Sequence, residues 1–423
     1  MIEIEQYRLD NGLNVCLNQD SSAPLVAVNL WYHVGSKDEV RGRTGFAHLF
    51  EHMLFSGSEN VGNNEHFRYV QAVGGVLNGT TFFDRTNYYE TVPSNYLSLA
   101  LWLESDRMGH FLPALTQEKL DIQKQVVQEE RRLRYDNAPY GTWFEELLRL
   151  AYPADYPYHW PTIGSMADIE AATLEDVTEF FERWYRPRNA VLTLVGDFDR
   201  NEAHEMIETY FGDIPGGDDL PSFKARRTAV EADARETIRS AVQLPRLFRL
   251  YHLPKMGDRL WFSGDLLGGI LAGGKSSRLE RHLVYEDKLA QDVSMFVLPT
   301  EATGLLVLMA TARPGTSIDK LESEIDRLIE EVVESGVTDD EIARARNQTE
   351  TDHAHQLEQY ETRADLAGMF RTFFGDASLM NNWLDNYLEL TPERLGADAA
   401  LIFRPDNRVT VQFLPNGEEG DND

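Results

Sequence analysis

The sequence predicts an α+β protein of two similar domains, each a β-sheet packed with helices and related to the other by internal duplication. The chain has 423 residues, more than a single hydrophobic core usually supports. A stretch of turn formers and acids, Pro215 to Pro221, interrupts it near the middle. Segments 173–191 and 391–409 also share a register. We therefore expect a first domain over 1–214, a linker over 215–224 and a homologous second domain over 225–423.

The two segments have the same helix-ending and turn-forming residues at matching positions. Arg186-Pro187 in the first copy corresponds to Arg404-Pro405 in the second, and Asn189 corresponds to Asn407. A residue before proline is biased away from the helical conformation, and Asn favours turns. Each copy is therefore expected to end a helix and begin a strand, which is why we interpret the two segments as copies of one α/β unit.

The first domain alternates strand and helix signals. Apolar alternation around Asp10-Asn11-Gly12 predicts a hairpin, and the β-branched and aromatic run from Leu25 to Val34 predicts a strand. The helix expected over 45–56 begins after Thr44 and ends before Gly57. Further segments follow in order: a hairpin over 74–93, helices over 96–111, 117–135 and 173–184, and a strand over 190–195.

Composition excludes several functional classes. There are 70 acidic and 40 basic residues, for a formal charge of -30, so nucleic acid is a poor partner. The single cysteine, Cys16, rules out an intrachain disulfide and any Cys-rich zinc site. The first residues resemble no signal peptide, and no apolar run reaches about 18 residues. We expect a cytoplasmic protein with no membrane partner.

One short motif carries metal chemistry. His48-Leu49-Phe50-Glu51-His52 places two imidazoles four residues apart on an expected helix, so that both lie on one face and can hold the same ion. Glu51 projects toward that face as well. This H-x-x-E-H arrangement is the inverzincin motif.

A catalytic zinc needs a third protein ligand. The expected helix over 117–135 offers Glu129 and Glu130. Adjacent helical residues point about 100° apart, so only one of them can face the metal. Periodicity does not decide which.

Several ordered motifs resemble one family along essentially the whole chain. They are Gly45 to Gly57, Gly74-Gly75-Val76-Leu77-Asn78, Asp84-Arg85-Thr86, Val92-Pro93, Pro157-Tyr158 and Gly273 to Leu279. The sequence is similar to pitrilysin-type zinc metallopeptidases of family M16, including the half-size bacterial members and the catalytic subunit of the mitochondrial processing peptidase. The first domain would then be the zinc-bearing one, and the second its non-zinc homologue.

The resemblance implies a zinc endopeptidase acting on unfolded peptides. It assigns Zn²⁺ to His48, His52 and Glu130, because Glu130 precedes Arg131-Arg132 as the family's third ligand does, with Glu129 as the fallback. Glu51 would be the general base. Asn78 would lie on an edge strand that binds substrate as an added strand.

Two positions depart from the family pattern. Gln123 stands where many members have a second glutamate, and Val284 and Gln291 stand where members have an Arg and a Tyr that hold the substrate carbonyl. Tyr285, in a different register, is interpreted as a packing residue. The resemblance therefore implies a heterodimer in which a related subunit supplies the Arg/Tyr pair.

Two alternatives remain open at this point. A homodimer, or a monomer, of the same family with its own oxyanion stabiliser is one of them, and the homodimer is the runner-up assembly. The other functional class is a non-catalytic structural subunit, similar to the core proteins of respiratory complexes.

Overall fold

The computed structural model describes residues 1–220 and 234–416, which form two compact units. The described residues of the first unit are 1–131, 160–220 and 353–383. Those of the second unit are 132–159, 234–352 and 384–416. The two units interleave along the chain.

This division differs from the linear one expected from the sequence. Residues 132–159 belong to the second unit, and residues 353–383 belong to the first. The reason is packing: the helix α12 (Tyr360–Phe374) lays Ala364 and Phe370 on apolar residues of the first sheet. The local sequence of a helix does not show which of two similar sheets it will cover. The expected linker, 215–224, lies partly outside the described residues.

The first unit contains a six-stranded sheet in the order β1-β2-β6-β3-β5-β4. Only β2 and β6 run parallel, and every other neighbouring pair is antiparallel. The strands are β1 (Glu5–Arg8), β2 (Asn14–Gln19), β3 (Leu25–Tyr32), β4 (Val76–Thr81), β5 (Thr86–Pro93) and β6 (Ala190–Gly196). β4 is an edge strand, paired only with β5 among the described strands.

The second unit repeats this topology with five strands in the order β7-β11-β8-β10-β9. β7 and β11 run parallel, and the other pairs are antiparallel. The strands are β7 (Ala234–Ser240), β8 (Arg246–Leu253), β9 (Ala290–Leu298), β10 (Gly304–Ala312) and β11 (Arg408–Pro415). The order and the pairing directions match β2-β6-β3-β5-β4, which confirms the predicted duplication.

The repeated residues make equivalent hydrogen bonds in both units. Thr173 and Thr391 are the N-caps of α7 (Leu174–Trp184) and α14 (Pro392–Ile402), and each hydroxyl accepts a backbone N–H. The Asn189 amide donates to Trp184 O at 2.9 Å and to His33 O at 3.3 Å. The Asn407 amide donates to Ile402 O at 2.9 Å and to His252 O at 3.0 Å. Each Asn thus ties the end of a helix to a neighbouring strand.

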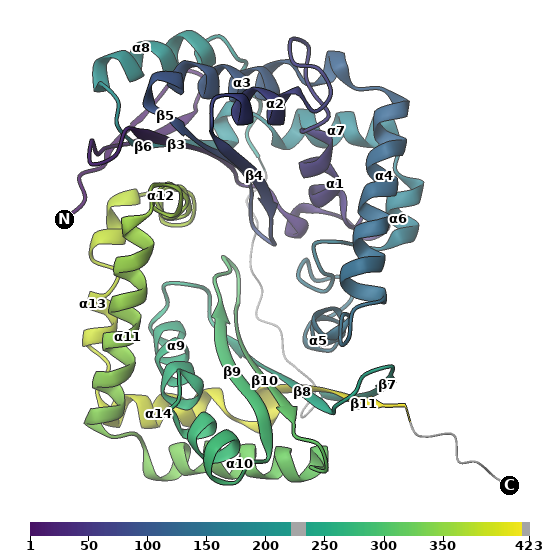
Figure 1. Cartoon of the computed structure of the whole chain (residues 1–423), viewed down its shortest axis with the longest axis vertical. Helices are drawn as coiled ribbons and strands as arrows, with labels where there is room; N and C mark the ends of the chain where they lie inside the picture. Colours follow the sequence, from purple (N-terminus) through teal and green to yellow (C-terminus); the bar gives the residue numbers. More distant parts are fainter. Residues whose placement is uncertain (221–233, 417–423) are drawn as a thin grey trace, which may run out of the picture. The chain divides into compact units, whose positions relative to one another are not determined.

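Helices cover the sheets (Figure 1). Those of the first unit are α1 (Phe46–Met53), α2 (Glu65–Ala72), α3 (Leu97–His110), α4 (Gln117–Arg131), α6 (Met166–Ala171), α7, α8 (Arg200–Phe211) and α12. Those of the second unit are α5 (Trp143–Ala151), α9 (Arg259–Ala272), α10 (Ile318–Ser335), most of α11 (Asp339–Glu358), α13 (Asp385–Leu388) and α14. Within the described ranges, none is long and apolar enough to cross a membrane.

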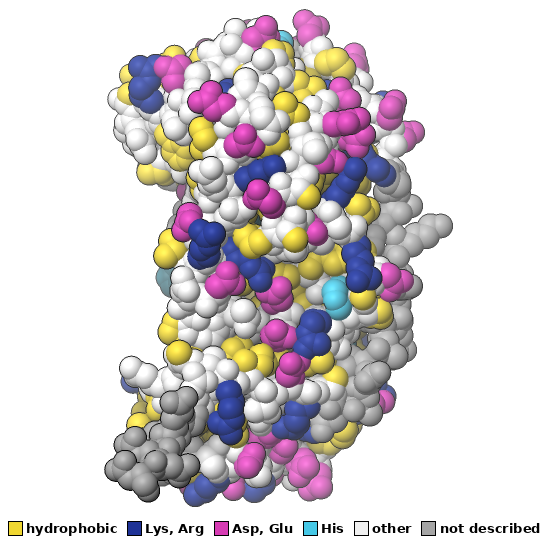
Figure 2. Space-filling model, turned by 90° about the vertical axis from the view of Figure 1, so that its right-hand side faces the viewer, with side chains coloured by type: hydrophobic (Ala, Val, Ile, Leu, Met, Phe, Trp, Pro, Cys, Tyr) yellow, Lys and Arg dark blue, Asp and Glu magenta, His cyan; other side chains and the backbone are white. Residues whose placement is uncertain are grey.

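Acidic and basic side chains are interspersed on the molecular face drawn in Figure 2. Lys and Arg are spread among Asp and Glu there and form no continuous basic area. Phosphate backbones are bound by clustered basic residues. This face therefore lacks the surface that a nucleic-acid partner needs.

A charged cluster is buried in the core of the first unit. His66 of α2, Glu90 of β5 and Glu104 of α3 place side-chain atoms within 4.8 Å of one another, and Arg107 of α3 forms an ion pair with Glu104. Burial, and then the charge of Glu104, raise the pKa of Glu90 well above its usual range. Burial also acts to raise the pKa of Glu104, but Arg107 and His66 outweigh it and lower this pKa to about 2. The cluster therefore balances its charge internally, with Arg107 paired to Glu104 and Glu90 protonated.

We expect Glu90→Gln to gain stability over wild type as the pH rises. The wild-type folded state keeps a proton on Glu90 that the unfolded state loses above its ordinary pKa of 4.5, so wild-type stability falls with rising pH. Gln resembles the neutral acid and has no proton to lose. Urea unfolding at about pH 5 and about pH 8 measures the difference.

Glu104→Gln is the matched control for this prediction. Removing the Glu104 charge leaves the buried Arg107 uncompensated, which typically costs about 3–5 kcal/mol. A Glu90→Gln variant whose stability relative to wild type is the same at both pH values would contradict a protonated Glu90.

Candidate metal centre

The helix that carries H-x-x-E-H is fixed at its N-terminal end. Gly45 has a left-handed φ of 85°, and a Cβ at this position would lie 2.7 Å from Ile163 O, so a side chain is excluded. The Glu39 carboxylate accepts hydrogen bonds from Gly45 N at 2.9 Å, Ala47 N at 2.8 Å and Trp160 Nε1 at 3.0 Å. Burial raises the pKa of Glu39 to about 8, although these three donors oppose that shift. A loop acid gives no periodic signal, so the sequence did not indicate Glu39.

The two histidines of the motif lie together as their spacing predicted. His48 Nε2 and His52 Nε2 are 3.3 Å apart, with the rings in an edge-to-face arrangement. Both side chains are part-buried, at 13% and 22% exposure. Their Nε2 atoms are therefore close enough to share one ion, and neither side chain is fully buried.

Helix α4 supplies the third group. It packs beside α1 (Figure 1) and brings Glu130 Oε2 to 3.7 Å from His48 Nε2 and 3.3 Å from His52 Nε2. Glu129, one residue earlier, is exposed and lies outside this group. Of the two glutamates that the sequence left open, the structure therefore places Glu130 beside the histidines.

The three side chains fit a zinc ion. Tetrahedral ligands at about 2.0–2.2 Å from zinc stand about 3.3 Å from one another. The observed separations of 3.3, 3.3 and 3.7 Å lie close to that value. Two imidazoles and one carboxylate are also a ligand set that catalytic zinc uses, with a fourth position left for water.

Glu51 of the motif does not belong to this group of three and contacts β4 instead. Its carboxylate Oε2 accepts a hydrogen bond from Thr81 Oγ1 at 2.5 Å. Burial raises the pKa of Glu51, although the Thr81 hydroxyl and His52 oppose that shift. Its carboxylate also interacts electrostatically with His52 and Glu130, so Glu51 lies near the three-residue group without belonging to it.

The open edge of β4 runs next to Glu51. Asn78 is exposed on this strand, and its side-chain oxygen accepts a hydrogen bond from Gly79 N at 2.9 Å. Gly79 is buried, and a Cβ there would lie 3.1 Å from Glu51 Cγ. The face of β4 on which Gly79 lies is therefore packed closely against Glu51.

The residues that differ from the family pattern lie in both units. Gln123 Nε2 donates to Ser56 Oγ at 3.1 Å. In the second unit, Val284 is 8% exposed and Gln291 is exposed on β9. Tyr285 is 48% exposed, so its interpretation as a packing residue is wrong: the helical turn that buries Val284 leaves its neighbour in solvent.

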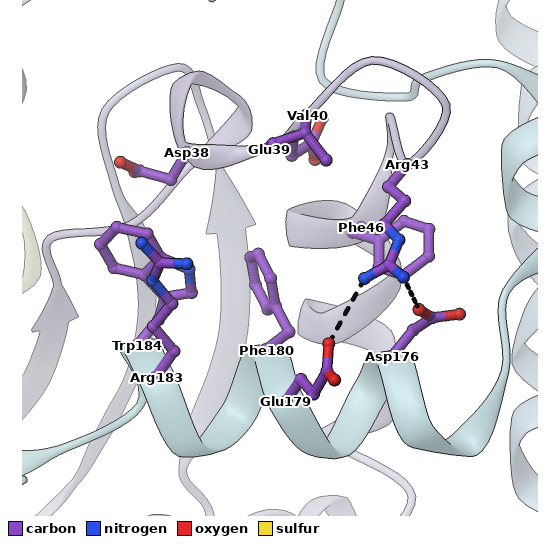
Figure 3. A pocket seen from close by; sticks show the side chains of 10 residues that line it. All are labelled: Asp38, Glu39, Val40, Arg43, Phe46, Asp176, Glu179, Phe180, Arg183 and Trp184. Atoms are coloured by element: carbon purple, nitrogen blue, oxygen red, sulfur yellow. Dashed lines mark hydrogen bonds and ion pairs between the residues drawn. The ribbon is translucent and has the colours of Figure 1, made fainter.

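A separate cavity of about 100 Å³ lies at the N-terminal end of α1 (Figure 3). Phe46, Phe180 and Trp184 form apolar walls, and Arg43 closes one side through an ion pair with Asp176 at 2.8 Å. None of His48, His52 and Glu130 lines it. The candidate metal centre is thus distinct from this cavity.

Two family models match the chain. One, described as Insulinase (Peptidase family M16), matches residues 14–155, which include α1 and α4. The other, described as the peptidase M16 inactive domain, matches residues 171–349. The chain belongs to peptidase family M16.

Relatives of similar length are named zinc proteases. Zinc protease PqqE of Helicobacter pylori is 28% identical, over 97% of this chain and 93% of that protein. An uncharacterized zinc protease of Streptomyces coelicolor is 27% identical, over 94% of this chain and 86% of that protein. The metal in the names of both relatives is therefore zinc.

Solved structures share the complete fold. A crystal structure of a protease from Helicobacter pylori superposes with a TM-score of 0.91 at 27% identity, covering 98% of this chain and 100% of that one. A putative M16-like peptidase from Alicyclobacillus acidocaldarius gives a TM-score of 0.85 at 22% identity, covering 98% and 99%. The second likeness concerns the fold alone. Both confirm the predicted two-domain α+β architecture.

Proposed function

We propose that this chain is a zinc-dependent endopeptidase that hydrolyses unfolded peptides and acts as the catalytic subunit of a dimer with a related chain. The observation that carries the proposal is the approach of His48, His52 and Glu130 within 4.8 Å of one another, with Glu51 next to them. A cytoplasmic location is part of the proposal.

Each residue has a distinct task in this proposal. His48, His52 and Glu130 would hold Zn²⁺ through two imidazole nitrogens and a carboxylate oxygen. When bound, zinc makes water more acidic and polarises a peptide carbonyl. Glu51 would accept the proton of the attacking water and pass it to the departing amine. Proton uptake and delivery by one carboxylate leave Glu51 unchanged after each turnover.

The peptide would bind along β4. Among the described strands β4 pairs only with β5, so an extended chain can add to its other edge as a further strand. Asn78 lies at this edge, one residue before the Gly79 backbone that touches Glu51. Main-chain pairing requires an extended segment, so the proposed substrates are unfolded peptides.

A non-catalytic core-like subunit is the other functional class. Such a subunit needs the fold but has no use for a buried carboxylate beside three ligand groups. The distances and the placement of Glu51 support the enzyme over this alternative. The family model that matches residues 14–155 is also the one not described as inactive.

The proposal is tested on one protein substrate in two states. We expect about one zinc per chain. In the presence of a related subunit that carries the Arg/Tyr pair, the chain should cleave a protein that chemical modification keeps unfolded. It should not cleave the same protein in its folded form. A chelator should stop cleavage, and added zinc should restore it. Cleavage of the folded form at an internal site, or cleavage that survives removal of all metal, would refute the proposal.

A further inference from the structure

The two faces of β4 have different surroundings. Gly79 and Thr81 face α1, where Gly79 meets Phe55 and Glu51 and Thr81 bonds Glu51. Thr80 lies between them and faces the opposite way, with its hydroxyl 2.5 Å from Asn87 Oδ1. This alternation is the period-two geometry of a strand. Two residues of the edge strand are therefore directed at the proposed general base.

Contacts restrain Glu51 at two points along its side chain. At the Cγ methylene, Gly79 allows the strand to approach so closely that a Cβ would lie 3.1 Å away. At the carboxylate, Thr81 Oγ1 holds Oε2 at 2.5 Å. Among the described residues, Thr81 is the only one that donates a hydrogen bond to the Glu51 carboxylate. It leaves Oε1 available to a water.

Thr81 is itself held in place. It is the last residue of β4 and pairs with Thr86 of β5, and the turn between them is closed by Phe82 N bonding Arg85 O at 2.9 Å. The Arg85 guanidinium donates back to Thr80 O at 2.9 Å and lies 5.4 Å from the centre of a Trp31 ring. The Thr81 hydroxyl therefore projects from an anchored hairpin end.

We propose that Thr81 is a positioning residue that aims the Glu51 carboxylate, and that Gly79 permits the contact by leaving the strand without a side chain. This inference rests on the proposed function. A long, flexible glutamate must stand within hydrogen-bond reach of the water it deprotonates, and an error of about 1 Å in such a geometry can cost about a hundredfold in rate. Thr81 belongs to β4, the strand beside which the peptide would bind. The backbone of β4 would therefore position both the substrate and the Glu51 carboxylate.

The test compares Thr81→Val with Thr81→Ser. Val keeps the shape of Thr but cannot donate a hydrogen bond, so we expect kcat on an unstructured peptide to fall about tenfold to a hundredfold. KM and the zinc content should not change, because the strand edge and the three ligands are intact. Ser keeps the donor and should restore most of kcat.

Thr91→Val is the matched control, because Thr91 is on the adjacent strand β5 and its buried hydroxyl has no hydrogen-bond partner among the described residues. It should behave as wild type. Gly79→Ala provides a second test, with an expected fall in kcat at full zinc content as the added methyl displaces Glu51.

The outcomes separate this inference from the proposed function. Wild-type kcat in Thr81→Val would overturn the inference and leave the peptidase proposal standing. Loss of zinc, or a rise in KM that accounts for the whole effect, would also overturn it, because Thr81 would then be only structural. A wild-type chain that cleaves nothing with or without the related subunit would refute the proposed function itself.

Discussion

Replacing Glu51 by Gln is expected to abolish peptide cleavage while the chain keeps its zinc. The amide is nearly isosteric with the carboxylate but cannot accept a proton from water, and general-base catalysis typically contributes about a hundredfold to ten-thousandfold in rate. His48, His52 and Glu130 are unchanged in this variant, so the metal should stay bound. Zinc analysis and peptide cleavage, measured on the same preparation, test both halves of the prediction.

Variants of the three ligands should behave in the opposite way. His48→Ala, His52→Ala and Glu130→Ala should each lose zinc and activity together, because two remaining ligands hold zinc poorly. Glu129→Ala is the matched control on the same helix, and it should keep both. Full zinc in Glu130→Ala together with zinc loss in Glu129→Ala would reverse the assignment of the third ligand. A Glu51→Gln variant with wild-type turnover would remove Glu51 from the mechanism.

The second large effect is expected from a partner chain. The resemblance to family M16 places Val284 and Gln291 of the second unit where an Arg and a Tyr are expected. Val284 has no side-chain donor for the developing oxyanion, and Gln291 offers an uncharged amide in place of the phenol. Loss of one such donor typically costs about a hundredfold to a thousandfold in rate. We expect the isolated chain to cleave an unstructured peptide slowly, and an M16-type chain with the Arg/Tyr pair to raise kcat by about that factor.

Two controls sharpen this test. The same partner with its Arg changed to Ala should bind this chain but give little stimulation. The double variant Val284→Arg, Gln291→Tyr of this chain should gain activity as a homodimer, with Gln291→Tyr as the single-change control and thermal unfolding as the check that the buried position tolerates Arg. Full activity of the isolated wild-type chain, unaffected by the partner, would show that the stabilising groups lie elsewhere in it.

Much of the fold was predictable because its signals are local. Thr173 and Asn189 mark the start of a helix and the beginning of the next strand, and they recur as Thr391 and Asn407 with the same hydrogen bonds. The expected helix over 45–56 is observed as Phe46–Met53. Its ends are shorter because Gly45 and Leu54 are only capping residues.

The membership of the two units was not predictable in the same way. Residues 353–383 follow most of the second unit in sequence, yet they complete the core of the first. Asp365 of α12 accepts hydrogen bonds from Trp31 Nε1 at 2.7 Å and from Asn87 Nδ2 at 3.0 Å. These contacts join residues more than half the chain apart, and neither partner has a sequence pattern that indicates the other.

By itself, the sequence determined that His48 and His52 share a helical face, because four residues span about one turn. It also determined that a second helix carries Glu129 and Glu130 and that the chain contains two copies of one α/β unit. Only the tertiary structure decided that α4 turns Glu130 toward α1, and that Gly79 and Thr81 of an edge strand hold Glu51. The physical reason is that periodicity fixes directions within one element, whereas the rotation and approach of two elements depend on how their side chains pack.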